Sequence, residues 1–168
     1  MNTIVLFLLS FTIQNSWGHG GEDHSKKKSP KVIHDSIDSD SKEVEEVEEV
    51  YKKINTSYLK KIKPIFKKSC FDCHSSQTTY PWYYKVPGVK QLIDADIKEA
   101  KSHLDFSNDY PFISHDSPEN DLKSIEKSVS KKTMPPKKYL WMHNNAKLSQ
   151  KEVEEIKKWV KESLEALK

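Results

Sequence analysis

Two cysteines and a histidine stand close together in the segment Cys70-Phe71-Asp72-Cys73-His74, which has the pattern Cys-x-x-Cys-His. Cysteines three positions apart lie near one face of a helical turn, where their sulfurs can form thioether bonds to the two vinyl groups of one porphyrin. The histidine that follows is then held beneath the ring, with a ring nitrogen directed at the iron. This spacing predicts covalent attachment of one c-type haem through Cys70 and Cys73, with His74 as the proximal iron ligand.

A redox-active dithiol and a zinc site are the alternatives for this cysteine pair. A thioredoxin-like dithiol requires a strand just before the cysteines, whereas the segment from Tyr58 to Lys68 is rich in lysine and contains Pro64. A zinc site requires a second pair of Cys or His residues at ligand spacing, and the sequence does not offer one. Haem attachment is therefore favoured over both alternatives.

Met134 is the candidate for the distal iron ligand. It lies 60 residues after His74, and the two prolines that follow it keep the loop out of a helix and stiffen its backbone. A thioether favours the softer ferrous iron, so His/Met ligation raises the reduction potential relative to His/His ligation. Met142, His143 and an open sixth position remain alternatives.

The elements that must position these residues are predicted to be helices. Pro64 suits the first turn of a short helix that runs to Cys73 and delivers the attachment site. Apolar side chains at three- and four-residue spacing predict further helices over residues 41–55 and 89–104, and another that starts at Ser117-Pro118. The chain is therefore expected to be mainly α.

A last helix is predicted at the C-terminus. Ser149 and Glu152 form a capping box at its start, and Trp159 belongs to its apolar face. We expect Trp159 to pack against the helix that carries Cys70.

The N-terminal segment has the features of an export signal. Residues 1–18 contain an apolar run from Ile4 to Ile13, followed by Ser16-Trp17-Gly18 with small residues at the usual cleavage positions. The run is too short to span a bilayer as a regular helix, and an uncleaved anchor is the alternative. The protein is accordingly expected in the periplasm, with membrane contact only if the leader is retained.

Two further regions follow the leader. Residues 19–40 are polar and predict a flexible linker, whose histidines are interpreted as solvated side chains. Residues 41–168 are predicted to form the haem-binding domain, with an acidic leading helix at 41–55 and a haem core over about 62–168.

The basic residues limit the classes of partner. All 28 are lysines, and the absence of arginine disfavours specific nucleic-acid recognition. From Tyr51 onward the chain has 23 lysines and 15 acidic residues, an excess of eight positive charges. Lysines around a haem edge can steer an acidic redox partner into a weak, salt-sensitive encounter. Simple solvation of the lysines, or their masking by the acidic segment Asp35 to Glu49, are the alternatives.

The chain from about Ile62 to Lys168 resembles the cytochrome-c-like haem-binding domain family of bacterial exported proteins. The matching stretches are Cys70 to Thr78 with Pro81-Trp82-Tyr83, Asp96 to Glu99 with Leu104 to Ser107, Met134-Pro135-Pro136 with Tyr139, and His143 with Leu148-Ser149. The resemblance implies a small cytochrome-c-like helical domain around one haem, attached at Cys70 and Cys73, with His74 as the proximal ligand and a distal role for Met134. The sequence departs from the family pattern at Ala100-Lys101 and at Asn108 to Tyr110, outside the iron site.

The expected function is electron transfer. An exported c-type cytochrome domain with one haem per chain would pass single electrons between redox partner proteins. A haem-based sensor or a peroxidase-like protein with an exchangeable sixth ligand is the alternative. The sequence places no acid-base constellation on the distal side, so an electron carrier is favoured over a catalyst.

Overall fold

The computed structural model describes residues 37–168, and side chains are described from Val44 onward. The predicted signal peptide and most of the predicted linker lie outside the described residues. The leading helix begins at Ile37, so it includes the last four residues assigned to the linker from the sequence. No helix in the described part of the chain is long and apolar enough to cross a membrane.

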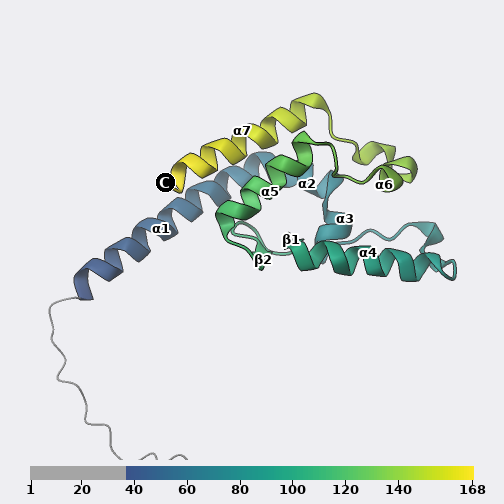
Figure 1. Ribbon diagram of the computed structural model, residues 1–168, viewed down its shortest axis with the longest axis horizontal. Coiled ribbons are helices and arrows are strands. Elements are labelled where there is room, and N and C mark those ends of the chain that lie inside the picture. The colour runs from purple at the N-terminus through teal and green to yellow at the C-terminus, as the bar shows by residue number, and fades with distance from the viewer. Residues whose placement is uncertain (1–36) are drawn as a thin grey trace, which may run out of the picture. The chain divides into compact units, whose positions relative to one another are not determined.

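The described chain is mainly helical (Figure 1), as the sequence predicted. Its α-helices are α1 (Ile37–Ser57), α2 (Lys63–Ser69), α3 (Phe71–His74), α4 (Val89–His103), α5 (Pro118–Ser130), α6 (Lys137–Met142) and α7 (Gln150–Ala166). Shorter turns are η1 (Tyr58–Ile62), η2 (Trp82–Lys85) and η3 (Asn144–Ala146). Two short antiparallel strands, β1 (Leu104–Asp105) and β2 (Ile113–Ser114), pair with Leu104 opposite Ser114.

A π-helical turn, η1, connects α1 to α2 without leaving the helical conformation. The N–H of Lys63 donates to the carbonyl oxygen of Tyr58, five residues earlier, instead of four. The next residue, Pro64, has no N–H and cannot make the regular α-helical hydrogen bond. Pro64 lies in the first turn of α2 as predicted, but α2 continues the leading helix and does not begin a separate one.

The hydrophobic core lies where η1, α2, α5 and α7 meet, and α5 and α7 run side by side (Figure 1). Its most buried members are Tyr58, Ile62, Phe66, Leu122, Ile156, Trp159 and Val160. The ring of Trp159 is 6.5 Å from that of Phe66 on α2, in an edge-on arrangement. This contact confirms the expectation that Trp159 packs against the helix leading to Cys70.

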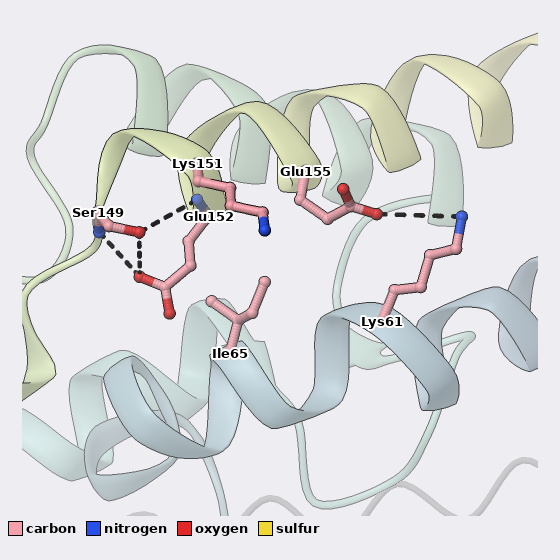
Figure 2. A pocket seen from close by; sticks show the side chains of 6 residues that line it. All are labelled: Lys61, Ile65, Ser149, Lys151, Glu152 and Glu155. Atoms are coloured by element: carbon pink, nitrogen blue, oxygen red, sulfur yellow. Dashed lines mark hydrogen bonds and ion pairs between the residues drawn. The ribbon is translucent and has the colours of Figure 1, made fainter.

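The start of α7 is held by the predicted capping box. The Ser149 Oγ accepts a hydrogen bond from the Glu152 N–H at 3.3 Å, and the Glu152 carboxylate accepts one from the Ser149 N–H at 2.8 Å. Figure 2 shows this cap in a surface groove between α2 and α7, where Ile65 points towards α7 and Lys61 pairs with Glu155 at 3.9 Å. These contacts attach α7 to the helix that precedes the cysteines.

Candidate haem site

The Cys-x-x-Cys-His motif forms a single tight turn between α2 and α3. Cys70 leaves the regular helical conformation, with φ −125° and ψ −34°, although its N–H still donates to the Phe66 oxygen at 2.7 Å. The N–H groups of Cys73 and His74 both donate to the Cys70 oxygen, at 3.2 and 3.0 Å. The helix predicted to run unbroken to Cys73 is therefore interrupted at Cys70, and the motif residues Phe71–His74 form α3.

His74 is oriented by a backbone carbonyl. Its Nδ1 lies 2.8 Å from the Leu104 oxygen. Because a carbonyl only accepts hydrogen bonds, Nδ1 carries the proton and Nε2 is the nitrogen that can coordinate iron. Burial lowers the pKa of His74, which favours the neutral ring that a metal ligand requires.

Residues 104–107 pack against His74. The Phe106 N–H donates to the His74 carbonyl oxygen at 2.6 Å, and the Phe106 ring lies 5.5 Å from the imidazole. The Ser107 N–H donates to Asp105 at 2.8 Å, and the Ser107 Oγ accepts the Ser76 N–H at 2.8 Å. Phe106 also belongs to the aromatic core, so the core extends up to the proposed proximal ligand.

The two cysteine side chains are half-buried. Burial raises the pKa of the Cys70 thiol to about 12, and the neighbouring Cys73 adds to the shift. Burial, followed by the charges of Asp72 and Asp96, also raises the pKa of Cys73. Redox-active dithiols have lowered pKa values because the thiolate is the reacting species. The raised pKa values of both thiols therefore argue against a reactive dithiol.

Apolar side chains are exposed on the elements around the motif. Leu92 of α4 is 58% exposed, Trp82 of η2 is 80% exposed and Trp141 of α6 is 87% exposed. Neither α4 nor α6 contains a fully buried side chain, although α4 packs directly against α3. Such a surface beside two cysteines and an oriented histidine fits a flat, mostly apolar porphyrin.

Met134 lies in the loop between α5 and α6, with its side chain 42% exposed. Pro135 is buried, and Pro136 is the N-cap residue of α6. Met142, the last residue of α6, is also exposed. The distal role of Met134 stays a prediction.

His143 has partners of its own. Its ring stacks on that of Tyr139, with 4.2 Å between ring centroids and 9° between planes. Its Nδ1 is 3.2 Å from the Tyr139 carbonyl oxygen, and its Nε2 is 3.5 Å from the Tyr83 hydroxyl. Tyr139 and His143 line a pocket of 330 Å³ together with Asp72. Both ring nitrogens of His143 therefore have polar neighbours, and the choice between Met134 and His143 as the distal ligand stays a prediction.

Asp72, between the two cysteines, connects three segments. Its Oδ1 accepts the Thr79 N–H at 2.9 Å, and its Oδ2 accepts the hydroxyl of Tyr139 at 2.7 Å. Sequence reasoning assigned no role to Asp72 or to the Leu104 carbonyl. The acidic residue inside the motif could have pointed to a role for Asp72. The Leu104 carbonyl belongs to the backbone, so the residue type gives no indication of its role.

Comparison with known proteins agrees with haem binding by this domain. Residues 31–162 match the haem-binding domain family. The chain is also similar to the cytochrome c peroxidase Ccp of Escherichia coli (strain K12), with 36% identity over 95 residues, which is 55% of this chain. The match covers 20% of that peroxidase, so the two proteins share only a segment. No solved structure matches the chain.

Proposed function

The chain belongs to the haem-binding domain family, and we propose that it is a c-type cytochrome domain that carries one covalently attached haem and transfers single electrons. In this proposal Cys70 and Cys73 form the thioether links, His74 is the proximal ligand and Met134 the distal ligand. The observation that carries it is the hydrogen bond from His74 Nδ1 to the Leu104 oxygen, at 2.8 Å, within the Cys-x-x-Cys-His turn.

The residues around the site suit an electron carrier. Bound haem supplies a one-electron redox couple at its iron. The Leu104 carbonyl fixes the imidazole of His74, and Phe106 with the aromatic core excludes water from the proximal side. A ligand that is held in place and shielded from water changes its geometry little when the iron gains or loses an electron. A small change in geometry supports rapid electron transfer.

A peroxidase-like function is the second candidate. It is favoured by the 36% identity over 95 residues to a cytochrome c peroxidase, of which this chain covers only 20%. Peroxide chemistry needs an exchangeable position on the iron, whereas an electron carrier keeps both axial ligands. Carbon monoxide binding to the ferrous protein and peroxide consumption by the reduced protein therefore separate the two functions.

The first experiment tests covalent attachment. The protein is produced in an exporting host with haem-attachment machinery, then analysed by intact mass and by haem staining of a denaturing gel. A haem-sized mass increase that survives denaturation supports the proposal, and one such increment per chain supports a single haem. An apo mass with two titratable thiols or a disulfide would overturn it.

The second experiment tests the distal ligand. Met134→Ala should lower the reduction potential and admit carbon monoxide to the ferrous iron, because a weakly ligated or open position replaces the thioether. His143→Ala is the comparison variant, and it should change carbon monoxide binding far less than Met134→Ala does. If His143→Ala opens the iron and Met134→Ala does not, the distal assignment is reversed.

Export and partner choice belong to the same proposal. We infer that residues 1–18 direct the chain to the periplasm, where covalent haem attachment is completed in bacteria, and N-terminal sequencing of the mature protein tests this.

An acidic redox partner is expected because lysines exceed acidic residues by eight from Tyr51 onward. The rate of electron exchange with an acidic partner should then fall as salt is added.

A further inference from the structure

One contact connects the attachment turn to the segment that carries the proposed distal ligand. Asp72 lies on α3 next to Cys73, and its Oδ2 accepts the hydroxyl hydrogen bond of Tyr139 at 2.7 Å. Tyr139 is on α6, five residues after Met134. The opposite carboxylate oxygen of Asp72 accepts the Thr79 N–H at 2.9 Å, which fixes the carboxylate plane. Asp72 thus joins the attachment turn to the helix that follows the Met134 loop.

Few other contacts fix the position of α6. None of its side chains is fully buried, so packing alone does not hold it. Lys138 pairs with Asp96 of α4 at 2.8 Å, but Lys138 is exposed, and exposed ion pairs contribute little. The bond between Tyr139 and Asp72 also has a carboxylate acceptor but is half-buried, so water weakens it less, which makes it the stronger of the two attachments.

The ring of Tyr139 is itself held in place. His143 stacks on it with 4.2 Å between centroids, and the His143 Nε2 lies 3.5 Å from the hydroxyl of Tyr83. The stack holds the Tyr139 side chain in one orientation, with its hydroxyl directed at Asp72. Little side-chain freedom is then lost when the hydrogen bond forms.

We propose that Asp72 and Tyr139 are positioning residues that hold the Met134 loop where its thioether would bind the haem iron. This inference rests on the proposed function, because it takes Met134 as the distal ligand. Loss of the hydrogen bond releases α6 and lowers the fraction of protein with Met134 bound. A hydrogen bond to a charged group corresponds to a change of about tenfold or more in such an equilibrium.

Tyr139→Phe tests this role in the full-length protein with haem attached. The variant removes one hydroxyl and leaves the motif itself unchanged. Tyr84→Phe is the matched control, because the Tyr84 hydroxyl donates to Asp94 at the same 2.7 Å but links η2 to α4 and does not touch α6. The readouts are the charge-transfer absorption of methionine-ligated ferric haem, the carbon monoxide binding rate of the ferrous protein and the thermal midpoint.

The expected result is a weaker methionine band and carbon monoxide binding about tenfold faster in Tyr139→Phe, with wild-type values in Tyr84→Phe. Asp72→Asn, which keeps one acceptor oxygen but removes the negative charge, should shift both readouts in the same direction. A wild-type band and rate in Tyr139→Phe, with only a lower thermal midpoint, would show a purely structural bond and overturn the inference alone. A wild-type protein with haem but no methionine band would instead overturn the distal assignment and the inference together.

Discussion

The core side of this domain, where η1, α2, α5 and α7 meet, and its haem side, formed by α3, α4 and α6, are assembled differently. On the core side, Trp159 of α7 is 2% exposed and contacts the rings of Tyr58 and Phe66. On the haem side, Trp141 of α6 is 87% exposed and α4 buries no side chain completely. The core side is complete with protein side chains alone, whereas the haem side presents apolar groups that a porphyrin would cover. Cofactor binding and protein stability should therefore be separable by mutation.

The largest effect is expected from removal of the attachment sulfurs. In a Cys70→Ala/Cys73→Ala variant the haem stain of a denaturing gel should disappear, because no thioether can form. Amide exchange should then become fast in α4 and α6 while α5 and α7 keep their protection, since only the haem side loses its cover. Equal loss of protection in both regions would contradict the division into two sides.

Two tryptophan substitutions compare the sides directly. Trp159→Ala should lower the free energy of unfolding by about 3–5 kcal/mol, since it leaves a large cavity in the core. Trp141→Ala, the same chemical change at an exposed site, should alter the free energy of unfolding of the apoprotein by less than about 0.5 kcal/mol. Urea unfolding of both variants measures the difference, and similar losses would contradict the comparison.

A smaller effect is expected at the start of α7. Ser149→Ala removes the acceptor for the Glu152 N–H and should cost about 1 kcal/mol of unfolding free energy. The haem spectrum should stay unchanged, because α7 contributes to the core side. A spectral change in Ser149→Ala would show that the two sides are coupled through this cap.

The smallest effect is a dependence on pH. Burial by itself would raise the pKa of Glu152, but hydrogen bonds from Lys68 and Ser149 lower it overall. A carboxyl whose folded pKa lies below its unfolded value stabilises the fold above the unfolded pKa, and this contribution is lost as the pH falls through the folded pKa. The stability difference between wild type and Glu152→Gln should therefore shrink from about pH 7 to about pH 3. A stability difference that does not change with pH would show that Glu152 acts through packing and not through its charge.

Local sequence patterns predicted the helices well. The capping residues Ser149 and Ser117 begin α7 and α5 as expected, because an N-cap depends only on residues within one turn. The helix predicted over 89–104 corresponds to α4. The spacing of Cys70, Cys73 and His74 was equally local, and the structure gathers them in one turn.

Contacts between distant segments were not predictable in the same way. The bond from Tyr139 to Asp72 joins positions 67 residues apart, and the Leu104 carbonyl that orients His74 is 30 residues away. The short helix α6 and the pair β1 and β2 also escaped prediction, since their few residues provide no repeating pattern. Such contacts depend on how the chain returns on itself, which residue spacing does not encode.

The π turn η1 makes the link between α1 and α2 tolerant of the loss of a single residue. It accommodates one more residue than a regular α-helical turn, as the hydrogen bond from the Lys63 N–H to the Tyr58 oxygen shows. Deleting one residue there would restore the regular four-residue hydrogen-bond spacing and leave the residues after it at nearly the same rotation about the helix axis. A deletion within a regular α-helical turn would instead rotate everything after it by about 100°, so that Phe66 would leave the core and the cysteine turn would face another direction. A homologue that lacks one residue at the π turn would therefore need no compensating insertion before its haem motif.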